Sequence, residues 1–245
     1  MTWVTAQVAG NYSAEGVTYL EVSFGVNVAA GSLVVAFGSW MAPSGYSGFE
    51  ELATPGDTFG DGAAWQTAGK ALGGDGLGGA VVTKLWYKVV GTSPGSGKMV
   101  AIQNQGSSSG NVGLIIANFT PPLPLKALKA GTYSGNSGIG STLNLTSFAA
   151  GNNIMCVSAG RVITTAAVNG PSSWGVNYNA VCKADFQQIH CLATYFPTTN
   201  VTADPDWTIT GSHAWCGNAA GFESWAKPPP STTFFQYLLS QKAFG

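Results

Sequence analysis

Charged side chains are scarce in this sequence. It has 10 Lys+Arg and 11 Asp+Glu among 245 residues, or 9%, where soluble globular proteins carry about 25%. Arg161 is the only arginine and the formal net charge is −1, which excludes the basic surface that nucleic-acid binding requires. No apolar run approaches the roughly 20 residues needed to cross a bilayer, so a membrane-spanning helix is excluded too. We therefore expect no nucleic-acid partner and no membrane partner.

Groups suited to acid/base catalysis are also few, because the chain has only two histidines. Glycoside hydrolysis needs two carboxyl groups held across a cleft. A calcium site needs several oxygen ligands, and the EF-hand pattern is absent. The acidic residues that we considered lie in glycine-rich segments and are equally typical of solvated turns, so we expect no enzyme. The candidate pairs are Glu50 with Glu51, Asp57 with Asp61, and Asp204 with Asp206; Asp57, Asp61 and Asp75 are the candidate calcium ligands.

Cysteine and histidine occur without the spacing of a metal site. Structural zinc sites usually draw ligands from tight C-x2–4-C pairs, and none occurs here. His190 and Cys191 are adjacent, so on a strand they face opposite sides. We expect no metal and no cofactor. The candidates for such a site are Cys182, His190, Cys191, His213 and Cys216.

The four cysteines, Cys156, Cys182, Cys191 and Cys216, all lie in the second half of the chain. Their even number allows three disulfide pairings in an oxidising environment. The first residues, MTWVTAQVAG, lack the basic and apolar regions of a secretory signal, so we expect synthesis in a cytosol. Cytosolic thiols stay reduced, and free cysteine is among the most buried residues. We therefore expect buried free thiols.

Strand patterns dominate the sequence, and helical periodicity is nearly absent before residue 230. Residues 17–28 are a predicted strand, in which 22–28 alternate apolar and polar side chains, as a half-buried strand does. Residues 33–40 (LVVAFGSW) form a continuous apolar run, which predicts a central strand covered on both faces. A further strand over 112–119 should stop at the prolines that begin at Pro121, because proline cannot donate to a central ladder. The other predicted strands are 3–8, 80–90, 98–104, 141–148, 153–158, 176–182, 189–196, 207–210 and 213–225.

About a dozen short strands with frequent turns predict an all-β fold, an antiparallel β-sandwich or jelly roll with long glycine-rich loops. We expect residues 1–226 to form this domain, with 41–79 as an inserted loop. That segment lacks clear periodicity, and long loops are usually functional. Its aromatic residues, Tyr46, Phe49, Phe59 and Trp65, are our candidates for contact between subunits.

Residues 91–99 (GTSPGSGKM) resemble a phosphate-binding loop only superficially. That motif needs glycine where Thr92 stands and a hydroxyl where Met99 stands. The segment also joins two predicted strands and not a strand to a helix. We therefore expect the loop of a hairpin.

The chain ends in a proline-rich spacer and an apolar tail, residues 227–245. Three consecutive prolines from Pro228 form a stiff extended spacer, and Ser231 is able to cap a short helix. The tail either folds back on its own domain or docks on a neighbouring subunit, which makes its apolar residues further candidates for subunit contact. These are Phe234, Phe235, Tyr237, Leu238, Leu239 and Phe244.

Three patterns in this sequence, together with the Pro/Gly-rich segment that follows the first, resemble a group of β-sandwich virion proteins of tailed bacteriophages. The patterns are residues 31–40 (GSLVVAFGSW), 85–90 (LWYKVV) and 112–119. In that group a G-x-L-[LV]-V strand ends in an aromatic residue and is followed by a glycine-rich loop and a W/Y-Y-K strand. The resemblance implies a structural role on the particle as capsid decoration (cement) protein, head fibre or tail appendage, and it implies no catalytic residue.

From this resemblance we expect a non-enzymatic protein of the virion, made in the bacterial host cytoplasm. Its partners would be the major capsid protein or other virion proteins, and it would form a homo-oligomer, a trimer. The alternative is a carbohydrate-binding module of a tail fibre or adhesin, with a glycan stacked on exposed aromatic rings; a glycoside hydrolase is a third. The tryptophans considered for such stacking are Trp65, Trp174, Trp215 and Trp225.

Overall fold

The computed structural model describes residues 3–13, 17–42, 51–74, 80–105, 110–121, 125–135, 139–144, 148–150, 154–162, 168–169, 178–184, 189–197, 201–203 and 206–224. Within these ranges the chain is all β and every strand pairing is antiparallel. The predicted fold class, an all-β antiparallel sandwich-like protein, is confirmed.

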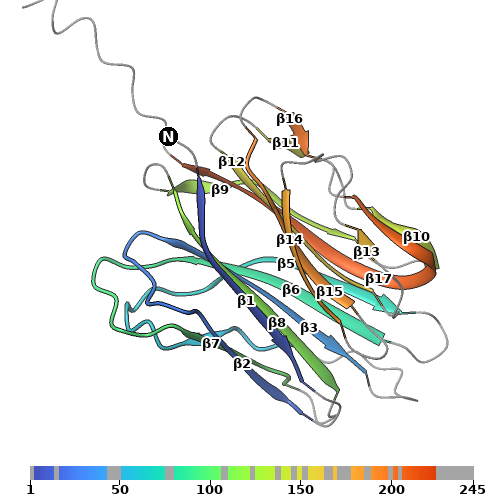
Figure 1. Ribbon diagram of the computed structural model, residues 1–245, viewed down its shortest axis with the longest axis horizontal. Helices are drawn as coiled ribbons and strands as arrows, with labels where there is room; N and C mark the ends of the chain where they lie inside the picture. The colour runs from blue at the N-terminus through green and yellow to red at the C-terminus, as the bar shows by residue number, and fades with distance from the viewer. Residues whose placement is uncertain are drawn as a thin grey trace, which may run out of the picture.

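A five-stranded sheet forms the middle of the molecule (Figure 1). Its order is β1 (Val4–Tyr12), β8 (Asn111–Thr120), β3 (Leu33–Met41), β6 (Ala80–Val89) and β5 (Gln66–Gly74). β3 is the central strand, and its Leu33 faces Val89 of β6 on one side and Phe119 of β8 on the other. This position accounts for the continuous apolar run in the sequence.

The central sheet is covered on both faces. One face carries a three-stranded sheet of β2 (Tyr19–Ser23), β7 (Met99–Gln103) and β4 (Gly56–Asp57). The other face carries a sheet in the order β10 (Ile139–Asn144), β17 (Asp206–Ser224), β12 (Ile154–Val162), β15 (Ile189–Tyr195) and β14 (Tyr178–Ala184). β9 (Leu125–Gly135) and β13 (Val168–Asn169) also pair with β17, while β11 (Phe148–Ala150) and β16 (Val201–Ala203) pair with each other.

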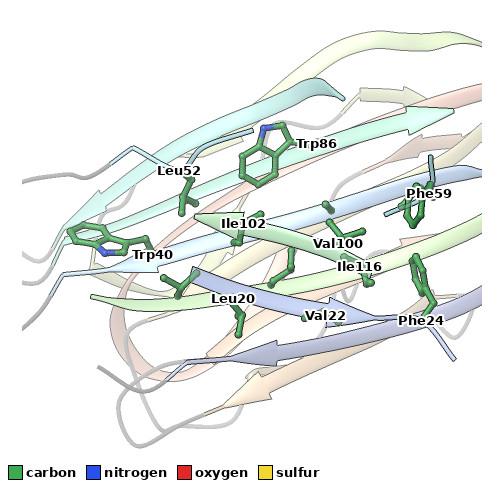
Figure 2. Packing of buried hydrophobic residues seen from close by; sticks show 14 of the residues in the cluster. Leu20, Val22, Phe24, Trp40, Leu52, Phe59, Trp86, Val100, Ile102 and Ile116 are labelled. Atoms are coloured by element: carbon green, nitrogen blue, oxygen red, sulfur yellow. The ribbon is translucent and has the colours of Figure 1, made fainter. Parts of the chain in front are cut away.

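Among the described residues, two large apolar cores result from this stacking. Alternate residues of β3 enter each of them, because successive side chains of a strand point to opposite faces. Val34, Ala36 and Trp40 enter the first core, which lies under β2 and β7 (Figure 2). Leu33, Val35 and Phe37 enter the second core, against β12, β15 and β17. The prediction that β3 is covered on both faces is confirmed.

The structure differs from the sequence-based prediction in several strands. The segment 41–79 is not a single irregular loop, because it contains β4 and β5. Residues 91–98 do not close a hairpin, since β6 belongs to the central sheet and β7 to the three-stranded sheet. The predicted strands 207–210 and 213–225 are one strand, β17, in which Gly211 takes a positive φ of 91°. β8 ends at Thr120, directly before Pro121, as expected.

The cysteines differ in state. Cys156 and Cys216 are buried and form no disulfide, as expected. Cys191 is disulfide-bonded, so the expectation of a free thiol is wrong for this residue. Cys182 of β14 lies directly opposite Cys191 of β15 in the strand register, and antiparallel neighbours have the Cα separation that a disulfide requires. This proximity across the sheet was not visible in the sequence.

Cys156 is expected to be unreactive in the folded chain. Burial raises the pKa of its thiol to about 12, and the thiolate is the reactive species. At pH 8, native protein treated with a thiol-reactive disulfide reagent should therefore show no modification of Cys156. The same treatment in denaturant should modify it fully. Modification at equal rates in both states, located by peptide mapping, would contradict the burial of this thiol.

Candidate functional site

Two lysines of β6 point toward the first apolar core. Successive residues of β6 point to opposite faces, so Lys84, Trp86 and Lys88 share one face. Trp86 is fully buried in that core. The side chain of Lys88 is only 1% exposed. A buried ammonium group is costly unless it is paired and hydrogen-bonded, so the partners of Lys88 define the site.

Lys88 is held between two carboxylates. Its Nζ lies 2.9 Å from Oδ2 of Asp57 and 2.7 Å from Oδ1 of Asp61. The two aspartate side chains are 10% and 2% exposed. We refer to Lys88, Asp57, Asp61, Phe59 and Trp65 as the Lys88 cluster. It connects a strand of the central sheet to β4 and to the segment that follows β4.

Other donors complete the hydrogen bonding of both carboxylates. Asp57 accepts bonds from the backbone N–H of Phe59 at 2.9 Å and from Nε1 of Trp65 at 2.7 Å. Asp61 accepts bonds from the backbone N–H of Gly91 at 2.8 Å and of Ala63 at 3.3 Å. Charge-assisted hydrogen bonds of this kind are the stronger ones in proteins. The orientation of each carboxylate is therefore well determined.

Aromatic rings line the ammonium group. Nζ of Lys88 lies 5.2 Å from the ring centre of Phe59 and 5.7 Å from a ring centre of Trp65. These distances are within the range of cation–π attraction. Phe59 is fully buried in the first core, and Trp65 packs against that core (Figure 2 labels Phe59). The rings therefore limit the access of water to Lys88.

The environment of Asp61 acts on its pKa in two directions. Burial raises the pKa, while hydrogen bonds from Lys88 and from the backbone of Gly91, together with the charge of Lys88, lower it. The net direction is downward. This environment therefore favours the carboxylate form of Asp61.

The segment after β6 holds the aspartates in place. The backbone N–H of Gly95 donates to the carbonyl of Phe59 at 2.6 Å, and that of Thr58 donates to the carbonyl of Met99 at 3.1 Å. Gly91 has to lack a side chain, because a Cβ there would lie 2.8 Å from the carbonyl oxygen of Asp61. Residues 91–99 thus support the Lys88 cluster.

A second charged group lies along the same strand. Glu51 pairs with both Lys70 and Lys84, and Lys84 also donates to the carbonyl of Leu52 at 3.0 Å. Here Glu51 is 39% exposed, so water shares in solvating it. The pKa of Glu51 is lowered, since the hydrogen bonds and charges of the two lysines outweigh the effect of burial. Both groups fasten residues 51–65 to the central sheet.

The structure places the predicted contact residues in different surroundings. Phe59 is fully buried in the first core, so it is not available to a neighbouring subunit; its place is set by β4, whose course was not predicted. Trp65 is half-buried and its indole N–H is bonded to Asp57. The remaining candidates lie outside the described residues: Tyr46, Phe49, Phe234, Phe235, Tyr237, Leu238, Leu239 and Phe244.

The structure brings together only some of the acidic residues that were considered for catalysis or calcium binding. Asp57 and Asp61 do come together, but around a lysine and not across an open cleft. Glu51 pairs with lysines, and Glu50, Asp75 and Asp204 lie outside the described residues. Among the tryptophans considered for sugar stacking, Trp215 is buried, and Trp174 and Trp225 lie outside those residues.

Sequence reasoning missed Lys88 as the centre of the site. The signal was present in residues 80–90 (AVVTKLWYKVV), where a period of two places both lysines on the face of Val82, Trp86 and Val90. An apolar face that includes lysines requires acidic partners. The sequence did not show which acidic residues these are.

Within the described ranges, no group of three or more His, Cys, Asp or Glu side chains is arranged to hold a metal ion. The same part of the chain contains no helix long and apolar enough to cross a membrane. Comparison with protein-family models, with curated proteins and with solved structures finds no match for this chain.

Proposed function

We propose that this chain is a non-enzymatic structural protein of a tailed-phage virion, a capsid decoration or cement protein that stabilises the head through subunit contacts. The observation that carries the proposal is the Lys88 cluster. Its carboxylates are already bonded to a buried lysine and to N–H groups, so they fasten layers of the fold together. Acid/base catalysis would need carboxyl groups that are open to a substrate.

The resemblance to phage virion proteins lends further support. The three patterns that carry it, residues 31–40, 85–90 and 112–119, include most of β3, β8 and the end of β6. These strands are adjacent in the central sheet in the order β8-β3-β6. The similarity therefore concerns one contiguous part of the fold.

The composition of the chain suits permanent association. A surface with few charges loses little solvation free energy when a partner covers it. Several apolar side chains near the start of the chain are exposed, among them Val4 of β1 at 55% and Val26, which follows β2, at 64%. In the proposed assembly the partners are the major capsid protein or other virion proteins, and copies of this chain form a trimer.

Deletion of residues 228–245 tests the assembly. The truncated chain is expected to keep its fold, because every described strand pairs with another strand that lies before residue 225, and to lose its oligomeric state and its binding to capsids. Circular dichroism checks the fold, light scattering the oligomeric state, and cosedimentation with particles the binding. A truncated chain that still forms trimers and binds particles would contradict the role of the tail.

The location on the particle tests the function itself. Immunogold labelling of intact virions should place the chain regularly on the head. Labelling of the tail alone, together with quenching of tryptophan fluorescence by host polysaccharide, would instead support the carbohydrate-binding alternative. Absence of the chain from purified particles would reject the proposed function.

A further inference from the structure

We propose that Lys88 and Asp61 condense into an intramolecular amide (isopeptide) bond, with Asp57 relaying the proton. The bond would join the central sheet covalently to the segment that follows β4. It is a modification of the folded chain and does not depend on the proposed function, since it needs only the residues of the Lys88 cluster.

The nucleophile and the electrophile are held in contact in a buried place. Nζ of Lys88 is 2.7 Å from Oδ1 of Asp61. Groups held in a near-attack orientation can reach effective concentrations of about 10⁵–10⁸ M. The backbone N–H of Gly91 holds the other oxygen, Oδ2, at 2.8 Å. That oxygen becomes negatively charged when the amine adds to the carboxyl carbon, and a fixed N–H donor stabilises this charge.

Asp57 is placed to move the proton. Its Oδ2 lies 2.9 Å from Nζ of Lys88, within direct transfer distance. The same oxygen accepts the indole N–H of Trp65 at 2.7 Å, which fixes its orientation. Asp57 is also the more exposed of the two aspartates. These features assign Asp57 to proton transfer and Asp61 to bond formation.

The reaction balances without a co-reactant. The ammonium group of Lys88 gives one proton to Oδ1 of Asp61, which leaves a neutral amine beside a carboxylic acid. The nitrogen lone pair attacks Cγ of Asp61 while a second proton passes from nitrogen to Asp57. Asp57 returns this proton to the Oδ1 hydroxyl, the Cγ–Oδ1 bond breaks, and water leaves. The third proton stays on the amide nitrogen, and Asp57 is regenerated as a carboxylate.

Burial favours the product over the ion pair. Two charges in a water-poor place are costly to keep, and condensation removes the charges of both Lys88 and Asp61. The rings of Phe59 and Trp65 beside Nζ hinder the return of the water needed for hydrolysis. The pair of Lys84 and Glu51 lacks this environment, because Glu51 is substantially exposed. It serves as the matched control.

The mass of the full-length chain tests the proposal. After folding at neutral pH, reduction and denaturation, the protein should be lighter than its sequence mass by one water molecule. Dehydration of the neighbouring Asp61 and Gly62 to a succinimide would remove the same mass. Fragmentation of the digested protein must therefore show a branched peptide that joins Lys88 to Asp61, and this peptide should resist hydroxylamine, which cleaves a succinimide.

Variants separate the proposed roles. Asp57→Asn and Lys88→Arg should both have the full, unmodified mass, while Glu51→Gln should keep the loss of water. Wild-type protein that retains its full sequence mass after prolonged incubation would overturn the proposal, whether or not a variant folds. A branched peptide joining Lys88 to Asp57, or an undiminished cross-link in folded Asp57→Asn, would overturn the roles assigned to the two aspartates.

Discussion

Substitution of Lys88 by methionine is expected to lower the free energy of unfolding by about 3–5 kcal/mol, the usual cost of leaving a buried charge without its partner. Methionine matches the length of lysine and keeps the contacts of the aliphatic chain, but it leaves Asp57 and Asp61 close together without a cation. The free energy of unfolding is measured by urea denaturation, followed by tryptophan fluorescence.

Lys84→Met is the matched control, because Lys84 lies on the same face of β6 but its partner Glu51 is substantially exposed. Its loss should be about 0–1 kcal/mol, as for surface ion pairs. The triple variant Lys88→Met/Asp57→Asn/Asp61→Asn should recover part of the loss, because no unpaired charge remains. Equal stability of Lys88→Met and wild type would contradict the role of the Lys88 cluster in holding the fold together.

Substitution of Trp86 by alanine should have a similarly large effect, a loss of about 3–5 kcal/mol. Trp86 is fully buried between the central sheet and the three-stranded sheet (Figure 2). Its removal leaves a cavity that the surrounding strands cannot fill by collapse. Urea denaturation again gives the free energy of unfolding. Tyr19→Ala, at an exposed position, should change it far less and controls for loss of an aromatic ring.

A second substitution tests the packing around Trp86. A Cβ at Gly38 would lie 2.6 Å from Cζ3 of Trp86, so Gly38→Ala alone should destabilise the fold through steric overlap. In the Trp86→Ala background the overlap with the indole is gone and only the 3.0 Å approach to the flexible Cδ1 of Ile102 remains, so Gly38→Ala should cost much less. Strict additivity of the two effects would contradict direct contact between these positions.

The strands of the central sheet were the most predictable part of the fold. Residues 33–40 are apolar without interruption, which occurs when a strand is covered on both faces, and β3 proved to be central with a core on either side. Proline at 121 ended β8 as expected, because proline lacks the N–H that a ladder needs. Both features depend on local chemistry, and local chemistry can be read from the sequence.

The segment 51–74 was predicted poorly, since it combines glycine, proline and scattered polar residues. β5 is an edge strand that contains several glycines, so the alternation of apolar and polar side chains is weak there. The strand exists because it pairs with β6 and packs under Trp215 and Cys216. Pairing between strands of low intrinsic propensity is decided by the neighbouring strand.

The sequence by itself determined that this is a folded all-β chain with few charges, because composition and the alternation of side chains along a strand are local properties. Only the tertiary structure decided which of those few charges meet. Lys88 is 31 residues from Asp57 and 27 from Asp61, and no local pattern links them. They come together because one sheet stacks on another, and a buried lysine is tolerated only where that stacking supplies its carboxylates.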